Sequence, residues 1–365
     1  MWITLAVIAA AVCGICIFLS QPRFGSIPKG ERLERILNSP HYRDGSFRNL
    51  HPTPQLTSDK SFAANLVGFL FRKTERLRPG GAIPSVKTDL RSLDRDRDML
   101  VWFGHSSYLL QLDGKRILVD PVLKGAGSPV SFINRPFRGT EVYRPEDIPE
   151  IDYLIISHDH WDHLDYGTVR AIKDRVGKVI CGLGVGQHFE RWGFGTDRLI
   201  ELDWNEEAVL ADGFRVWCLP ARHFSGRGLK PNRSLWASFL LEAPSRKVYI
   251  GGDSGYDTHY AEIAEKFDGI DLAILENGQY NADWKYIHTL PDQIAQTFGD
   301  LRAKRLFTVH HSKFALAKHP WEEPLKNIAA VAERESIPLI QPMIGEPVDL
   351  DGDSYELRKW WEGID

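Results

Sequence analysis

The stretch that decides the fold is Ile151-Asp152-Tyr153-Leu154-Ile155-Ile156-Ser157-His158-Asp159-His160-Trp161-Asp162-His163, in which an apolar run passes directly into a cluster of histidines and carboxylates. Neutral imidazoles and carboxylates are the groups that bind zinc and the neighbouring divalent metals. The cluster is too crowded for a single tetrahedral ion with an open position. His158 and His160 alternate and can face one metal, while Asp162 and His163, displaced by the turn, can serve a second. The spacing therefore predicts a two-metal site after a buried strand.

Three further ligand-type residues share one setting, because each follows an apolar stretch: His223 after 214–220, Asp253 after 247–252 and His310 after 305–309. Open α/β folds bind ligands at the carboxyl ends of their strands, so these side chains are expected to converge on His158. A lone histidine in a chain of 365 residues is more often structural. The order and strand-end placement of all three together predict a complete metal site.

The spacing His158-x-His160-x-Asp162-His163, followed by the three downstream residues in that order, resembles the metallo-β-lactamase fold superfamily. Flanking motifs narrow the resemblance to the zinc phospholipases D that hydrolyse N-acyl-phosphatidylethanolamines and to their bacterial relatives. These motifs lie at 102–106, 200–204, 220–225, 235–238, 252–256 and 310–316. The metal motifs are specific for the superfamily. The flanking motifs are specific for this branch but less so for a substrate.

Carried over position by position, the resemblance implies two zinc cofactors: the first held by His158, His160 and His223, the second by Asp162, His163 and His310, with Asp253 bridging both. Asp120, which ends the stretch 116–119, matches the superfamily's first motif and is expected to support the site from behind. Asp162 is expected to serve catalysis as well as metal binding.

Two residues are implicated in substrate binding by the same resemblance. His288 matches a histidine placed near the substrate phosphate, so it is expected to bind substrate and act in catalysis; the plainer alternative is that it caps a local turn. Trp161 stands where the animal phospholipase has a tyrosine thought to touch the lipid head group. An indole donates a hydrogen bond but cannot accept one, so the head-group preference stays open.

From residue 99 onward, stretches typical of strands alternate with stretches typical of helices. Strands are expected over 100–103, 108–112, 116–122 and 178–181, a hairpin over 235–241 and 247–251, and helices over 165–175, 258–266, 291–301 and 324–333. Asp165 is expected to cap the first of these helices. Two such halves give the α/β four-layer αββα sandwich that the resemblance also implies, in a hydrolase domain over 98–365.

Residues 1–20 are almost wholly apolar and uncharged, and as a helix the stretch would be about 28 Å long, close to the hydrocarbon core of a bilayer. We expect an uncleaved transmembrane anchor. The alternative is a cleaved signal peptide, which normally has a basic leader and a small-x-small cleavage site that are not evident here. Arg23, Lys29, Arg32 and Arg35 follow the stretch and no basic residue precedes it, which favours the cytoplasmic side for the remainder.

Residues 21–97 form an extension rich in proline and arginine. Within it, helical spacing places Phe62, Leu66, Phe69 and Leu70 on one side of the stretch 61–71. The favoured interpretation is a helix docked on the hydrolase domain. The alternative is a helix that lies in the surface of an anionic membrane and delivers substrate to the site.

The net charge of −4 gives no basic surface for nucleic acid, so no nucleic-acid partner is expected. With two zinc ions, two carboxylates and a bridging hydroxide, the site keeps a net positive charge, which suits a phosphodiester and its more charged transition state. We therefore expect a zinc-dependent phospholipase D-like hydrolase of membrane phospholipids, in which the hydroxide attacks phosphorus. The alternatives are a zinc hydrolase of lactones, β-lactams or other carbonyl substrates, and a non-catalytic metal-binding domain. The expected partners are the membrane and its phospholipids, with homodimerisation left open.

Overall fold

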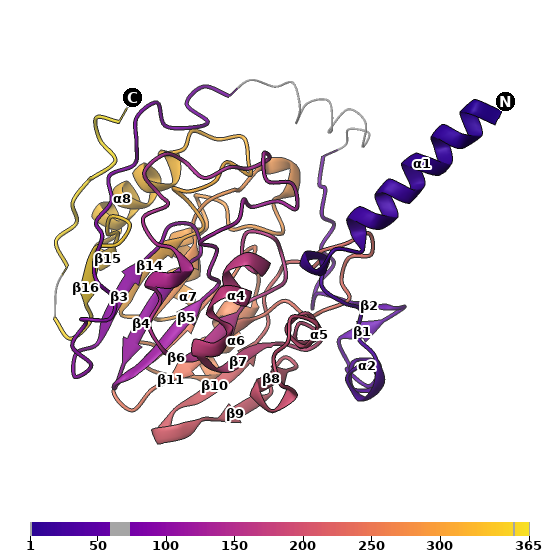
Figure 1. Ribbon diagram of the computed structural model, residues 1–365. Helices are drawn as coiled ribbons and strands as arrows, with labels where there is room; N and C mark the ends of the chain where they lie inside the picture. Colours follow the sequence, from indigo (N-terminus) through magenta and orange to yellow (C-terminus); the bar gives the residue numbers. More distant parts are fainter. Residues whose placement is uncertain (1, 59–73, 353–354, 365) are drawn as a thin grey trace.

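The computed structural model describes residues 2–58, 74–352 and 355–364. Two seven-stranded sheets face each other, with helices on their outer sides (Figure 1). The first sheet has the order β16 (Pro347–Asp349), β3 (Met99–Trp102), β4 (Tyr108–Leu112), β5 (Lys115–Val119), β6 (Ile151–Ile156), β7 (Val176–Gly182) and β8 (Leu199–Leu202). The second has the order β15 (Leu339–Ile340), β14 (Arg305–Val309), β13 (Leu272–Glu276), β12 (Lys247–Ile250), β11 (Ser238–Glu242), β10 (Arg215–Leu219) and β9 (Glu207–Val209).

Three apolar layers hold the sandwich together. Because successive strand residues point to opposite faces, Leu110 enters the layer between the sheets while its neighbour Leu109 faces the outer helices α4 (Tyr166–Ile172) and α5 (Gly186–Arg191). Side chains on the outer face of the second sheet likewise pack against three helices, α6 (His259–Lys266), α7 (Ile294–Asp300) and α8 (Glu323–Glu335). The expected four-layer αββα fold is confirmed.

Most element boundaries agree with the sequence. The predicted hairpin is the antiparallel pair β11 and β12, and Asp165 caps α4 by accepting from the backbone N–H groups of Gly167 and Thr168. One predicted strand is too long at its end. Instead of running to residue 122, β5 stops at Val119, because Asp120 adopts a φ of 42° that a strand cannot continue through.

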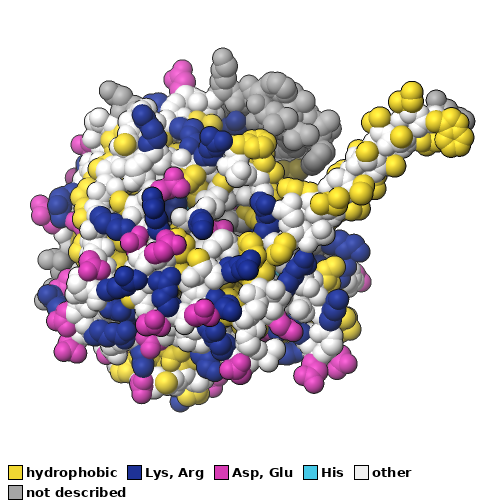
Figure 2. Space-filling view, in the orientation of Figure 1, with side chains coloured by type: hydrophobic (Ala, Val, Ile, Leu, Met, Phe, Trp, Pro, Cys, Tyr) yellow, Lys and Arg dark blue, Asp and Glu magenta, His cyan; other side chains and the backbone are white. Residues whose placement is uncertain are grey.

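The N-terminal helix α1 (Trp2–Leu19) projects away from the sandwich, and none of its described side chains is buried (Figures 1 and 2). By length and composition it is apolar enough to cross a membrane. After α1, the chain returns to the sandwich through α2 (Gly30–Leu37) and a short hairpin of β1 (Tyr42–Arg43) and β2 (Ser46–Phe47). The predicted amphipathic stretch 61–71 lies outside the described residues.

Candidate metal centre

The base of the site is made where two neighbouring parallel strands end. Asp120 follows β5 and Ser157 follows β6, and the Asp120 carboxylate accepts from the Ser157 backbone N–H at 2.9 Å and from its hydroxyl at 2.6 Å. The same carboxylate lies 2.8 Å from His163 Nδ1. Asp120 thereby holds the proton of His163 on Nδ1 and leaves Nε2 available to a metal. It stands behind the site, where the resemblance placed it.

A first group of three imidazoles converges beside this base. His160 Nδ1 lies 2.8 Å from His158 Nε2 and 3.2 Å from His223 Nε2. His223 donates through Nδ1 to the Ile287 carbonyl at 2.7 Å, which leaves its Nε2 free to coordinate. Burial lowers the pKa of both His158 and His223 well below the ordinary value, so both are neutral at physiological pH. Neutral imidazole is the form that binds metals.

The second group gathers around Asp162. Its Oδ2 lies 3.4 Å from His310 Nε2 and 3.5 Å from His163 Nε2. A residue not predicted as part of the centre joins it, because His105 Nε2 lies only 2.9 Å from the same oxygen. His105 is completely buried in the turn after β3 and packs on the His310 ring at 4.3 Å between centroids. The sequence contained a signal for it, since His105 lies in the flanking motif 102–106.

Asp253 lies between the two groups. Its Oδ2 is 3.1 Å from His163 Nε2 and 3.2 Å from His310 Nε2, and it is 3.7 Å from His223 Nε2 on the other side. Burial raises the pKa of this carboxyl, but the imidazoles of His163 and His310 outweigh burial and bring the pKa well below its usual value. Among the described residues, Asp253 Oδ1 finds no hydrogen-bond partner although it is buried.

A buried, ionised carboxylate with an unpartnered oxygen, facing imidazole nitrogens, is costly unless cations lie between them. The structure thus brings all seven predicted ligands together in two groups around one shared carboxylate, and this donor set fits two divalent metals. Which residues coordinate, and to how many ions, stays a prediction.

Glu276, at the end of β13, was not predicted. Its Oε2 lies 2.6 Å from His288 Nδ1 and 3.2 Å from His310 Nδ1, so one carboxylate orients both rings. Its Oε1 accepts from the backbone N–H groups of Ser254 and Thr289. The available signal was the same as for Asp253, a carboxylate directly after an apolar run. His288 is therefore held by Glu276 through Nδ1.

The adjacent histidines His310 and His311 have different surroundings. At His310 the backbone turns with a φ of 69°, and His311 lies away from the centre, with Nδ1 2.8 Å from the Ser312 hydroxyl. Burial lowers the pKa of His311 to about 3. Burial acts the same way on His310, but Asp253 and the other nearby carboxylates outweigh it and raise its pKa to about 10. A bound metal would take the place of that proton.

The centre opens into a cavity of about 210 Å³, hereafter the metal cavity, lined by five of the predicted ligands and His288, together with Phe224, Gln279, Trp284, Ile287 and Leu316. Its wall is thus apolar apart from the centre, His288 and Gln279. Trp161 does not line it. The indole lies under the Arg227 guanidinium, 4.1 Å from ring centroid to Cζ, and its ring meets Phe24 at 5.1 Å. A substrate contact for Trp161 stays a prediction.

Comparison with known proteins agrees with this geometry. The model of the Beta-lactamase superfamily domain matches residues 115–311, which is more than half of the chain. That range contains all seven predicted ligands, as well as Asp120, Glu276 and His288. The chain belongs to the β-lactamase superfamily, and it is a hydrolase of the metallo-β-lactamase fold.

Individual relatives add detail. An uncharacterized protein of Mycobacterium tuberculosis is 38% identical over 327 residues, covering 88% of this chain and 87% of that protein. The N-acyl-phosphatidylethanolamine-hydrolyzing phospholipase D 1 of Caenorhabditis elegans is 32% identical over 232 residues, covering 59% of this chain and 64% of that enzyme. A metallo hydrolase of the archaeon Ignicoccus hospitalis superimposes with a TM-score of 0.54 at 21% identity, over 72% of this chain and 99% of that one. This last similarity shows the fold alone.

Proposed function

We propose that the protein is a zinc-dependent phosphodiesterase that cleaves membrane phospholipids on the head-group side, as a phospholipase D does. The observation that carries the proposal is Asp253, set between two groups of imidazoles in a cavity that His288 and several apolar side chains also line. The similarity to a phospholipase D of Caenorhabditis elegans supports the same substrate class, although it covers less than two thirds of that enzyme.

The ligands decide the charge of the centre. Bound zinc would supply Lewis acidity and a hydroxide nucleophile at neutral pH. His158, His160 and His223 are neutral donors, whereas Asp162 and Asp253 contribute one negative charge each. This leaves the loaded centre positive, which stabilises a phosphoryl group as negative charge builds up on it. A site with more carboxylates would lose that advantage.

His288 is the residue placed to act on the substrate itself. Glu276 accepts from its Nδ1, so Nε2 is the ring atom left for the substrate. In its imidazolium form, with the charge balanced by Glu276, the ring can donate from Nε2 a hydrogen bond to a phosphoryl oxygen or a proton to the departing alkoxide. Glu276 is a positioning residue, because it acts through His288 and through His310.

The lipid character of the substrate rests on two apolar features. The metal cavity is walled by Phe224, Trp284, Ile287 and Leu316, which suits a glycerol backbone and the start of an acyl chain. The exposed helix α1 would insert in the bilayer and keep the enzyme at its substrate. The basic residues that follow α1 favour the cytoplasmic side.

The test begins with the purified, metal-loaded protein and a total lipid extract, with mass spectrometry to identify the lipids consumed and formed. The same incubation is then run in water labelled with heavy oxygen. Attack at phosphorus puts the label in phosphatidic acid and leaves the released alcohol unlabelled. Label in a free fatty acid, or turnover of lactones or β-lactams without lipid turnover, would favour a carbonyl hydrolase. An Asp253→Ala protein serves as the blank for contaminating lipases.

A further inference from the structure

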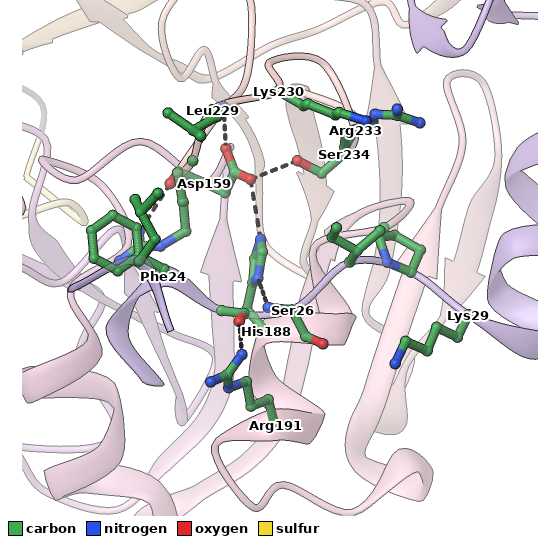
Figure 3. A pocket seen from close by; sticks show the side chains of 18 residues that line it. Phe24, Ser26, Lys29, Asp159, His188, Arg191, Leu229, Lys230, Arg233 and Ser234 are labelled. Atoms are coloured by element: carbon green, nitrogen blue, oxygen red, sulfur yellow. Dashed lines mark hydrogen bonds and ion pairs between the residues drawn. The ribbon is translucent and has the colours of Figure 1, made fainter. Parts of the chain in front are cut away.

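A second cavity, of about 480 Å³, lies where α1 joins the sandwich, and we call it the junction pocket (Figure 3). Residues 157–163, the metal loop, separate it from the metal cavity. Asp159 lines the junction pocket and the next residue, His160, lines the metal cavity, and the two cavities share no lining residue. The junction pocket is therefore a separate space with its own chemistry.

The junction pocket is strongly positive. Five cationic side chains line it, whereas its lining contains a single carboxylate: Lys29, Arg191, Arg227, Lys230 and Arg233 against Asp159. That carboxylate is already engaged, because Asp159 Oδ2 accepts from His188 Nε2 at 3.1 Å and from Ser234 Oγ at 2.7 Å, and Oδ1 accepts from the Gly226 N–H (Figure 3). The lining cations consequently exceed the negative charge that could balance them, which favours an anion in the pocket.

The five cations differ in how they are held. Arg233 donates to the Tyr42 hydroxyl at 3.0 Å. Arg227 and Arg191 are structural, since their guanidinium groups donate to backbone carbonyls, those of Asp159 and Leu164 for Arg227 and those of Gly25 and Ser20 for Arg191. Lys29 and Lys230 are exposed, and within the described part of the chain neither ammonium forms an ion pair. These two lysines are the groups free to take up a ligand.

The remaining wall of the junction pocket is apolar and continues into α1. Leu19, the last residue of that helix, lines the pocket together with Phe24, and so do Ile27 and Leu229, which are 64% and 81% exposed. Exposed apolar side chains at the mouth of a cationic pocket call for a ligand that carries both an anionic group and hydrocarbon. In a bilayer spanned by α1, the end of the helix would lie at the depth of the lipid phosphates.

We infer that the junction pocket binds the phosphate head group of an anionic phospholipid, whose acyl chains run beside α1. This lipid is a resident ligand and not the substrate, because the metal loop stands between it and the metal cavity. The inference goes beyond the proposed reaction and shares with it only the insertion of α1 in a membrane. Inorganic phosphate offers the same anionic chemistry without the hydrocarbon, so the experiment has to separate the two.

The test uses the full-length, metal-loaded protein in a neutral detergent, titrated with phosphatidylglycerol while the thermal unfolding midpoint is followed. The variant is Lys29→Gln/Lys230→Gln, with both changes on exposed side chains. The matched control, Lys326→Gln/Lys359→Gln, makes the same change of charge on α8 and the C-terminal segment, away from α1 (Figure 1). Phosphatidylcholine and inorganic phosphate are titrated in parallel.

We expect phosphatidylglycerol to stabilise the wild type and the control equally. Loss of each lysine should weaken its binding about fivefold, so that the pocket variant binds about 25-fold more weakly. Hydrolysis of a soluble phosphodiester should be the same in all three proteins. The inference would be overturned if the pocket variant and the control bound phosphatidylglycerol equally weakly. It would also be overturned if the wild type bound phosphatidylcholine as tightly as phosphatidylglycerol. Inorganic phosphate that binds as tightly as the lipid would show a simple anion site and overturn the lipid assignment.

Discussion

The metal cavity and the junction pocket lie on opposite sides of the same seven-residue loop, yet their chemistry is opposite. His158 and His160 face the metal centre with neutral nitrogens beside Asp253, a surrounding that attracts cations. Asp159, which lies between them, and Trp161, which follows them, face the N-terminal segment, where cationic side chains predominate. Because neighbouring side chains of this loop point to opposite sides, one short segment supplies walls to two different sites.

The two sites also differ in how their side chains are held. Around the metal cavity the second atom of most predicted ligands is fixed by a buried partner, as Asp120 fixes His163 and Glu276 fixes His310. In the junction pocket the lysines available for a ligand are exposed and have no partner carboxylate in the described structure. Substitutions should therefore be severe in the metal cavity and mild in the junction pocket, with Asp159 between the two.

The largest effect is expected for Asp253→Ala. Because Asp253 contacts both groups of imidazoles, its loss should release metal from both and reduce hydrolysis by about 10³-fold or more. His310→Ala should lose less metal, since the first group stays complete. Elemental analysis of the purified proteins measures this directly. A wild type that is active with one metal or none would contradict the two-metal arrangement.

His311→Ala is the matched control for His310→Ala. His311 is buried against Trp102 and bonds to Ser312, so its removal should lower the free energy of unfolding by about 1–3 kcal/mol. The metal content of His311→Ala should nevertheless match that of the wild type. Elemental analysis measures the metal content, and calorimetry measures the loss of stability. Full activity in His310→Ala combined with metal loss in His311→Ala would reverse the assignment of the pair.

Glu276→Gln should reduce hydrolysis by about 10–100-fold, the usual cost of removing a group that orients a metal ligand or a catalytic ring. The amide keeps the size of the side chain but lacks the charge that holds His288 at 2.6 Å. Metal content should change little, and the loss should fall on kcat and not on KM, because the His288 ring loses the carboxylate that orients it. An unchanged kcat would mean that His288 only caps a turn.

Asp159→Asn should give an intermediate effect. Three donors converge on this buried carboxylate, and an amide cannot accept from all of them. We expect the free energy of unfolding to fall by about 1–3 kcal/mol and hydrolysis to fall less than in Glu276→Gln, because no predicted ligand is removed. Denaturant unfolding measures the free energy of unfolding, and an assay with a soluble phosphodiester measures hydrolysis. A loss of activity as large as that of Asp253→Ala would show that Asp159 itself belongs to the metal centre.

The smallest catalytic effect is expected from removing residues 2–20. No residue of the metal cavity lies there, so hydrolysis of a soluble phosphodiester should stay close to that of the full chain. The truncated protein should leave the membrane fraction, and sedimentation after a high-salt wash would test this. Continued pelleting would point to the stretch 61–71 as the membrane-binding part.

Much of the site could be predicted from the sequence because strand-end residues meet at one edge of a sheet. His158, His223, Asp253 and His310 each follow an apolar run. The last three meet at one edge of the second sheet, because β10, β12 and β14 run in the same direction. The alternation of strands with helices along the chain similarly predicted two sheets covered by helices. Spacing separated His158 and His160 from Asp162 and His163, and the resemblance added the assignment of His223, His310 and the bridging Asp253 to the two ions.

What only the tertiary structure decided concerns contacts between segments far apart in the chain. Glu276 contacts both His288 and His310, and His105 contacts Asp162. Neither Glu276 nor His105 was predicted as part of the metal centre. The junction pocket is made where the segment after α1 meets the loop 226–234. Periodicity and spacing report the surroundings of a residue within its own strand or helix, whereas such contacts depend on how the elements pack. The sequence by itself therefore determined the fold and the expected ligands, and packing decided which partners hold them and where a second cavity forms.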